Sequence, residues 1–194
     1  MFNDTDNIKV PSMLNKLQKD VEQSGFNLSC DYQTGTILRT LAASKKGGYF
    51  LELGTGAGVS TSWILDGMDR DSTLVTVEQE ESLHTIAKKH LASDSRVSFY
   101  TGDGGKFIED AKDKEVYDFI FADTFPGKFY LLDETLQMLK QGGLYIIDDL
   151  TQVESWGDSH KQKVVELVSH IETREDLVIT KLFWSTGLII VTKI

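Results

Sequence analysis

The sequence has little cysteine, little proline and a shortage of basic residues, and each shortage excludes a class of protein. Cys30 is the only cysteine, so no disulfide can form within the chain, and a reducing compartment such as the cytoplasm is expected. The formal net charge is −10, from 20 Lys and Arg residues against 30 Asp and Glu residues. Because an acidic surface repels phosphate backbones, we expect no nucleic-acid partner.

Long apolar runs are lacking too. None approaches the roughly 18 residues that a membrane span needs, so we expect no membrane association. The first ten residues, MFNDTDNIKV, have neither a basic region nor an apolar stretch, and they therefore predict no signal peptide. Hydrophobic residues make up 40% of the 194, which is enough for a single domain with a sizeable core.

Helical and strand patterns alternate along the chain. Two helices, near 11–25 and 34–46, precede the first strand, so residues 1–46 are expected as a helical extension or lid and 47–194 as an α/β core. Strands are predicted near 49–53, 74–77, 97–100, 117–122, 144–147, 177–182 and 187–192. One intervening helix is expected to carry Leu132, Leu136 and Leu139, with a turn at 142–143. This alternation favours a mostly parallel sheet with helices on both faces.

A glycine-rich turn follows the first predicted strand, in the segment FLELGTGAG at residues 50–58. Its glycines are Gly54, Gly56 and Gly58. They let the backbone turn sharply and leave no side chain between it and a ligand. Ser60 can cap the helix that follows, whose free N–H groups face the same space. A strand-to-helix turn without any ligand is the alternative interpretation.

Two common nucleotide-binding patterns fit this turn poorly. The dinucleotide pattern G-x-G-x-x-G needs a third glycine where Val59 stands, and no Gly-Lys-Ser/Thr follows as in a phosphate loop. Glu52 stands two residues before the first glycine, where a carboxylate suits a cationic ligand better than a pyrophosphate. The turn therefore predicts a ligand with positive charge.

Acidic residues follow the second to fifth strands, at Glu78, Asp103, Asp123 and the pair Asp148-Asp149. Ligands of parallel sheets bind beyond the carboxyl ends of the strands, so these carboxylates are expected on one edge of a site. Glu78 is placed to accept hydrogen bonds from ribose hydroxyls, although it also fits the start of a helix. Asp103 also fits an ordinary Asp-Gly turn.

Together these segments resemble the class I S-adenosylmethionine-dependent methyltransferases, over about residues 34–194, and the glycine turn is similar to motif I of that family. The resemblance implies a Rossmann-like class I methyltransferase fold, a seven-stranded mostly parallel sheet, and S-adenosyl-L-methionine as cofactor. The implied cofactor-binding residues are Glu52, Gly54, Thr55, Gly56, Gly58, Ser60, Glu78, Gly102, Asp103, Gly104 and Asp123. Asp103 would receive the adenine amino group.

Two later segments, DFIFAD and GGLYIIDD, resemble the metal-binding regions of the cation-dependent O-methyltransferases of the catechol and caffeoyl-coenzyme A type; small bacterial members are the most similar. Asp123 and Asp148 match that family's metal aspartates, and Asp149 stands where the family usually has Asn. The resemblance implies Mg²⁺ or another divalent cation at these three residues. Alternatively, Asp123 contacts only the cofactor and the pair shapes a loop.

The resemblance also implies methyl transfer to a hydroxyl oxygen of a small molecule. That family's catalytic lysine lies three residues after the metal aspartate, where this chain has Pro126, and the nearest lysine is Lys128. Candidate catalytic residues are Lys128, His160 and Asp123, although the lysine and the histidine both also fit surface positions. Phe26, Tyr32 and the Trp156 loop are expected to close over the acceptor.

Other functions stay open. A methyltransferase acting on amines of nucleic acid would carry Asp/Asn-Pro-Pro-aromatic after the fourth strand, whereas this chain reads Ala-Asp-Thr-Phe at 122–125. A non-hydroxyl acceptor, a dehydrogenase and a cofactor-binding subunit without catalysis are further alternatives. The acceptor and the oligomeric state are open, with a homodimer as one option.

Overall fold

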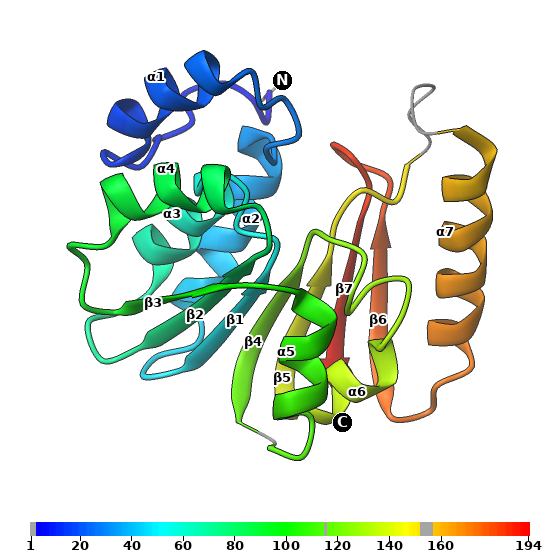
Figure 1. The fold of residues 1–194 in the computed structure, drawn as a ribbon. Helices are drawn as coiled ribbons and strands as arrows, with labels where there is room; N and C mark the ends of the chain where they lie inside the picture. Colours follow the sequence, from blue (N-terminus) through cyan, green and yellow to red (C-terminus); the bar gives the residue numbers. More distant parts are fainter. Residues whose placement is uncertain (1–2, 115, 152–156) are drawn as a thin grey trace.

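The computed structural model describes residues 3–114, 116–151 and 157–194, and its centre is one seven-stranded sheet (Figure 1). The strands are β1 (Tyr49–Leu53), β2 (Thr73–Glu78), β3 (Val97–Thr101), β4 (Tyr117–Ala122), β5 (Leu139–Ile147), β6 (Leu177–Leu182) and β7 (Leu188–Lys193). The helices are α1 (Leu14–Ser24), α2 (Tyr32–Ala43), α3 (Val59–Gly67), α4 (Glu81–Leu91), α5 (Gly104–Ala111), α6 (Leu132–Gln137) and α7 (Gly157–Glu172).

The strand order is β3-β2-β1-β4-β5-β7-β6, and only β7 runs antiparallel to its neighbours. The predicted mostly parallel sheet is confirmed. From β1 the chain builds outward to β3, then returns to place β4 on the other side of β1, with Leu53 opposite Ala122. In open α/β sheets this reversal leaves a crevice beyond the carboxyl ends of the two central strands, where ligands bind.

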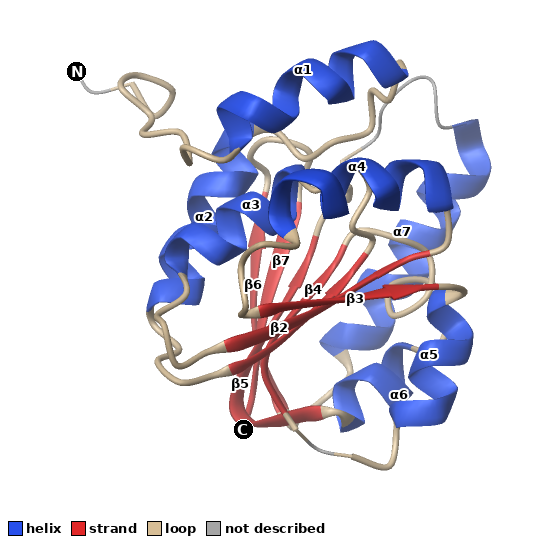
Figure 2. Ribbon diagram, turned by 60° about the vertical axis from the view of Figure 1, so that its left-hand side comes forward, coloured by secondary structure: helices blue, strands red, loops and turns tan. Residues whose placement is uncertain are grey.

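Neighbouring residues of a strand point to opposite faces of the sheet. The central strands carry apolar residues at successive positions, so both faces are apolar and both are covered by helices. Phe50 and Phe119 pack on the face covered by α1 to α4, while Leu51 and Ile120 pack on the face covered by α5 to α7 (Figure 2). All four side chains are fully buried. Continuous apolar runs such as YDFIFA therefore suit central strands that are buried on both faces.

Two neighbouring predictions are wrong, the helical placement of Leu139 and the turn at 142–143. Leu139 was expected on a helix with Leu132 and Leu136, but α6 ends at Gln137 and Leu139 begins β5, paired with Tyr117. The Lys193 ammonium donates to the carbonyls of Leu136 and Leu139, which ends the helix there. The glycines at 142–143, expected as a turn, lie inside β5 at an irregular register.

Of the two N-terminal helices, α2 packs beside α3 on one face of the sheet, and α1 lies above the end of the sheet (Figure 1). Helix α1 is tied to α4 by Asp20, whose carboxylate accepts hydrogen bonds from Lys89 (2.6 Å) and His90 (2.7 Å). This contact carries the loop between α1 and α2 toward the crevice. None of the helices in the described part of the chain is long and apolar enough to cross a membrane.

Candidate functional site

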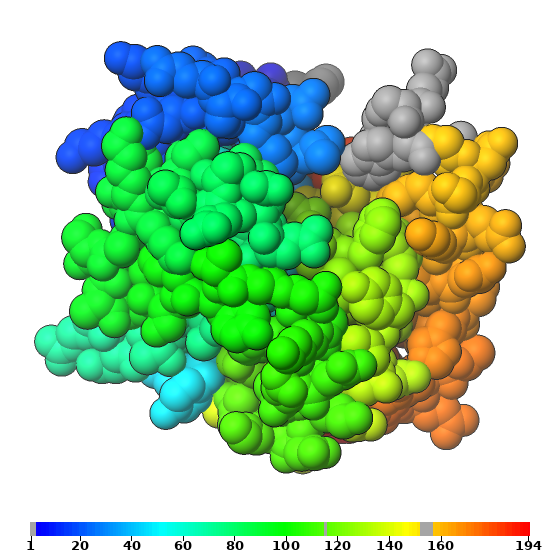
Figure 3. Space-filling view, in the orientation of Figure 1, coloured from blue at the N-terminus to red at the C-terminus, as the bar shows by residue number. Residues whose placement is uncertain are grey.

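A cavity of about 530 Å³ lies beyond the carboxyl ends of β1 and β4. Its volume is in the range of small-molecule sites. One wall is the glycine turn after β1 together with the loop between α1 and α2, and the other is the loop after β4 together with the start of α7. In the space-filling view the surface is hollowed between these two halves of the chain (Figure 3). The cavity therefore lies where the strand order places a crevice.

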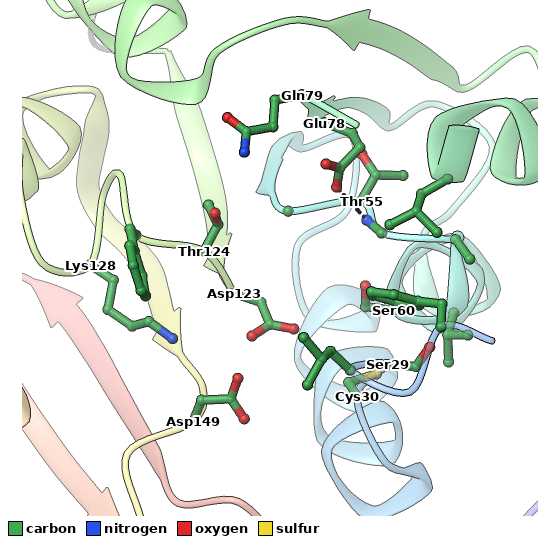
Figure 4. A pocket seen from close by; sticks show the side chains of 18 of the residues that line it. Ser29, Cys30, Thr55, Ser60, Glu78, Gln79, Asp123, Thr124, Lys128 and Asp149 are labelled. Atoms are coloured by element: carbon green, nitrogen blue, oxygen red, sulfur yellow. Dashed lines mark hydrogen bonds between the residues drawn. The ribbon is translucent and has the colours of Figure 1, made fainter. Parts of the chain in front are cut away.

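The glycine turn fits closely under the strand ends. Gly54 has φ +100°, and a Cβ atom there would lie 2.7 Å from the carbonyl oxygen of Asp123, so no other residue fits without strain. Gly56 and Gly58 also have positive φ. The Glu78 carboxylate accepts a hydrogen bond from the backbone N–H of Gly56 at 2.8 Å (Figure 4), which fixes the turn to the end of β2.

Two buried polar atoms near the turn have no hydrogen-bond partner among the described residues. Glu52 is buried beneath the turn, and its Oε2 accepts from Thr61 (2.5 Å) and Thr76 (2.6 Å), while Oε1 has no partner among the described residues. Burial raises the pKa of Glu52. Ser29 Oγ, in the cavity wall, is likewise buried and lacks a partner within the described ranges.

Three carboxylates meet on the opposite side of the cavity floor. Asp123, Asp148 and Asp149 each place an oxygen within 4.8 Å of the others. Burial, and after it the charges of Asp149 and Asp148, raises the pKa of Asp123 well above its usual range. Burial, and after it the charge of Asp149, raises the pKa of Asp148 to about 6. We call these three residues the acid cluster; its oxygens could hold a hard divalent cation.

The acid cluster is supported from behind. Asp148 is 1% exposed, and its Oδ1 accepts from the backbone N–H of Asp149 (2.7 Å) and from the Thr186 hydroxyl. Asp149 has a left-handed φ of +62°. Thr186 lies just before β7, so the hairpin between β6 and β7 helps to orient the acid cluster.

The loop after β4 brings Lys128 back to the acid cluster. Gly127 takes φ +81° in this loop, and its carbonyl accepts from the Tyr145 hydroxyl. Lys128 is then 3% exposed, and its ammonium donates to the carbonyl of Asp148 at 2.9 Å. A lysine two residues later than in the similar family thus reaches the cavity (Figure 4). Its catalytic role stays a prediction.

His160 also borders the cavity, from the first turn of α7. Its ring stands edge-on to Phe129, with 5.3 Å between ring centroids. Burial, and after it the positive charge of Lys128, lowers the pKa of His160, which favours a neutral imidazole at neutral pH. The structure therefore places Asp123, Lys128 and His160 around one cavity, as candidate catalytic residues require.

The predicted adenine residues lie at the far end. Gly104 lines a smaller cavity of about 160 Å³, which shares Gly54 and Glu78 with the main one. Within the described ranges, Asp103 lines neither cavity; it caps α5 by accepting from the N–H of Lys106 at 2.8 Å. The roles of Gly102, Asp103 and Gly104 in cofactor binding stay predictions, as do those of Thr55 and Ser60, which line the main cavity.

Phe26 and Tyr32 were expected near the acceptor, and the structure places only one of them in the cavity wall. Phe26 does line the cavity, but Tyr32 packs against Trp63, with ring centroids 5.7 Å apart. Residues that no motif indicated are Leu28, Ser29, Cys30, Gln79, Thr124, Phe125 and Lys163. They are identified only by their position around the cavity. The Trp156 loop lies outside the described residues.

Comparison with known proteins points to one family. The family described as "Methyltransferase domain" matches residues 51–150. A protein of Mycolicibacterium smegmatis named "Putative O-methyltransferase" is 31% identical over 118 residues, covering 58% of this chain and 56% of that protein. A Mycobacterium ulcerans protein of the same name is 30% identical over 130 residues, covering 64% and 57%. The chain thus spans little more than half the length of these curated relatives.

Solved structures share the fold. The O-methyltransferase TomG from Streptomyces achromogenes, in complex with SAM, superposes with a TM-score of 0.84 at 21% identity, covering 97% of this chain and 92% of that one. An O-methyltransferase from Bacillus cereus, in complex with SAH, gives 0.84 at 20% identity, covering 97% and 94%. At these identities the likeness shows the fold alone.

Proposed function

Because this chain belongs to the methyltransferase domain family and has its Rossmann-like class I fold, we propose that it transfers a methyl group from S-adenosyl-L-methionine to a hydroxyl oxygen of a small molecule, with a divalent cation. The observation that carries the proposal is the acid cluster: Asp123 and Asp149 line the same cavity as the glycine turn, and the buried Asp148 places an oxygen within 4.8 Å of theirs. In this proposal the glycine turn binds the cofactor on one side of the cavity, and the acid cluster binds the cation on the other side.

The glycine turn fits the cofactor. Gly54 lets the turn pack against the Asp123 backbone, with which a Cβ would clash, and so keeps the turn close to the cavity. Ser29 Oγ in the cavity wall and Glu52 Oε1 beneath the turn have no partner among the residues described. In this proposal Gly54, Gly56 and Gly58 with Thr55 and Ser60 hold the methionine half, Glu78 the ribose, and Gly102, Asp103 and Gly104 border the adenine. When bound, the cofactor supplies a methyl group that is already activated on a positive sulfur.

The acid cluster fits a hard cation. Three crowded carboxylates, of which burial raises the pKa of Asp123 and of Asp148, favour a positive partner, and Lys128 supplies only one charge. Asp123, Asp148 and Asp149 would hold the ion through oxygen atoms, as Mg²⁺ prefers. When bound, the ion lowers the pKa of the acceptor hydroxyl and orients it. An aspartate at position 149, in place of the family's Asn, adds one negative charge to the site.

The protein's own side chains then position the acceptor and take its proton. We assign the proton-accepting role to His160, because its lowered pKa keeps the imidazole neutral beside the cavity. Lys128, bound to the Asp148 carbonyl, holds the loop after β4 against the acid cluster. The enclosing walls exclude water and orient the acceptor, which can contribute about 7–11 kcal/mol in favourable cases.

The test combines binding and turnover. S-adenosylhomocysteine at about 100 times its Kd should stabilise the protein by about 2.7 kcal/mol in thermal unfolding, whereas nicotinamide dinucleotides should not. Catechols should be methylated with Mg²⁺ and not with a chelator. Cofactor binding without turnover of any acceptor would favour the non-catalytic subunit, and chelator-insensitive turnover would refute the metal role.

The setting of the reaction is part of the same proposal. A small-molecule acceptor and a cytoplasmic location fit the acidic surface and the single buried Cys30. A homodimer stays a prediction, which light scattering of the purified protein would test.

A further inference from the structure

Two phenylalanines border the acceptor side of the cavity. The rings of Phe125 and Phe129 stand edge to face with centroids 5.4 Å apart. Phe125 is 51% exposed and lines the main cavity, whereas Phe129 lines a groove of about 280 Å³ that continues past Lys128 toward α6 and α7. An exposed aromatic face of this kind is a surface on which a planar ring packs well.

A lysine ammonium lies directly over these rings. Lys163 Nζ is 4.7 Å from the centroid of Phe125 and 5.9 Å from that of Phe129, in the range of cation–π contacts. Lys163 lies three residues after His160 on α7, so both side chains share one face of the helix. It lines both the main cavity and the groove.

Lys163 is not neutralised by a carboxylate. Three other lysines form ion pairs with acidic residues, namely Lys89, Lys140 and Lys181. Lys163 forms no such pair with any residue in the described part of the chain. Most of the other lysines also form no ion pair among the described residues, so the position of Lys163 is what matters. Lys128 and Lys163 line the cavity, and Lys163 is the exposed one of the two, so its ammonium can attract an anionic group.

We infer that the methyl acceptor is an aromatic acid, whose ring packs on Phe125 and Phe129 and whose anionic substituent pairs with Lys163. This inference rests on the proposed methyl transfer and adds a substrate class to it. The acid cluster repels an anion at the reacting end, so the anion must point away from the transferred methyl. A hydroxyl at one end of the ring and a carboxylate at the other match this arrangement of charge.

The experiment compares acids with their neutral amides. Two catechol acids of different reach, protocatechuate and dihydrocaffeate, are each assayed beside their amides with S-adenosylmethionine and Mg²⁺, and kcat/KM is measured for each. The wild-type protein should prefer at least one acid over its amide by about fivefold, the size of one solvent-exposed charge pair. Raising the salt concentration should reduce this preference.

Three variants locate the effect. Lys163→Met keeps most of the aliphatic stem and should bring the acid-to-amide ratio close to one, mainly through KM. Lys163→Arg should retain the preference. Lys161→Met removes an exposed lysine of the same helix that lies outside the cavity lining, and it should leave the ratio unchanged. Equal ratios in the wild type and in Lys163→Met would overturn the inference, since a packing role affects acid and amide alike.

Binding separates this inference from the proposed reaction. If no acceptor is turned over, calorimetry on the protein loaded with S-adenosylhomocysteine decides: acid binding that Lys163→Met abolishes would support the anion subsite although the reaction proposal fails. Acid binding that is absent, or equal in the two proteins, would overturn the subsite. Failure of S-adenosylhomocysteine itself to bind would refute the methyltransferase proposal and this inference with it.

Discussion

Replacing Asp148 with asparagine should stabilise the metal-free protein at pH 8. The Asp148 carboxyl is 1% exposed, and burial raises its pKa from 3.8 to about 6. The raised pKa means that the folded protein favours the neutral form of the Asp148 carboxyl. The stability that this carboxyl contributes is complete below pH 3.8 and is lost as the pH rises through about 6.

The size of this stabilisation follows from the difference between the two pKa values of Asp148. One pH unit corresponds to about 1.36 kcal/mol, so the interval from 3.8 to about 6 corresponds to about 3 kcal/mol. Asparagine keeps the Oδ1 atom that accepts from the Asp149 N–H and the Thr186 hydroxyl, so these bonds are preserved. Because the titrations of Asp123 and Asp148 are linked, we expect a gain of about 1–3 kcal/mol at pH 8 in Asp148→Asn.

Urea unfolding measures this gain. Wild type, Asp148→Asn and the exposed-site control Asp113→Asn are unfolded at pH 5 and pH 8 with a chelator, and again with Mg²⁺. With chelator, the free energy of unfolding of Asp148→Asn should exceed that of the wild type at pH 8, and by roughly half as much at pH 5. Mg²⁺ should stabilise only the wild type and the control. A variant less stable than the wild type at pH 8 without metal would refute the reasoning.

Three further predictions concern single side chains. Gly54→Ala should weaken S-adenosylhomocysteine binding at least tenfold by calorimetry, because its Cβ would lie 2.7 Å from the Asp123 carbonyl oxygen; unchanged affinity would count against the cradle. His160→Gln should lower kcat by about 10²–10⁴ without changing cofactor affinity, and should remove the acidic limb of the pH–rate profile; a retained limb would exclude His160 as the base. Thr186→Val should weaken Mg²⁺ binding about tenfold, since it removes a hydrogen bond that orients Asp148; equal metal titrations would argue against this support.

The sequence predicted those parts of the molecule that follow from local pattern. Alternating apolar runs placed the strands, and the rule for parallel sheets then placed Glu78 and Asp123 on one rim. Leu139 was misplaced because its apolar spacing continues that of a helix, while the contact that ends the helix comes from Lys193, which is 54 residues away. Periodicity carries no information about such a contact.

The sequence predicted only part of the candidate site, because local pattern shows strand ends but not contacts between distant segments. The acidic residues at the strand ends were found, but the path of the loop that returns Lys128 depends on the positive φ of Gly127 and its contact with Tyr145. Ser29 lies in the cavity wall on the loop that follows α1, a helix held by the buried Leu14, Leu17 and Val21 and by the contact of Asp20 with α4. These contacts join distant segments and leave no mark in the local sequence.

The close approach of Gly54 to the Asp123 backbone has a consequence for the proposed reaction. The two segments extend adjacent strands, so strand spacing would set the distance between bound cofactor and bound acceptor. Under the proposal, substitutions in the surrounding loops would change which acceptor binds, while the distance over which the methyl group is transferred would stay the same.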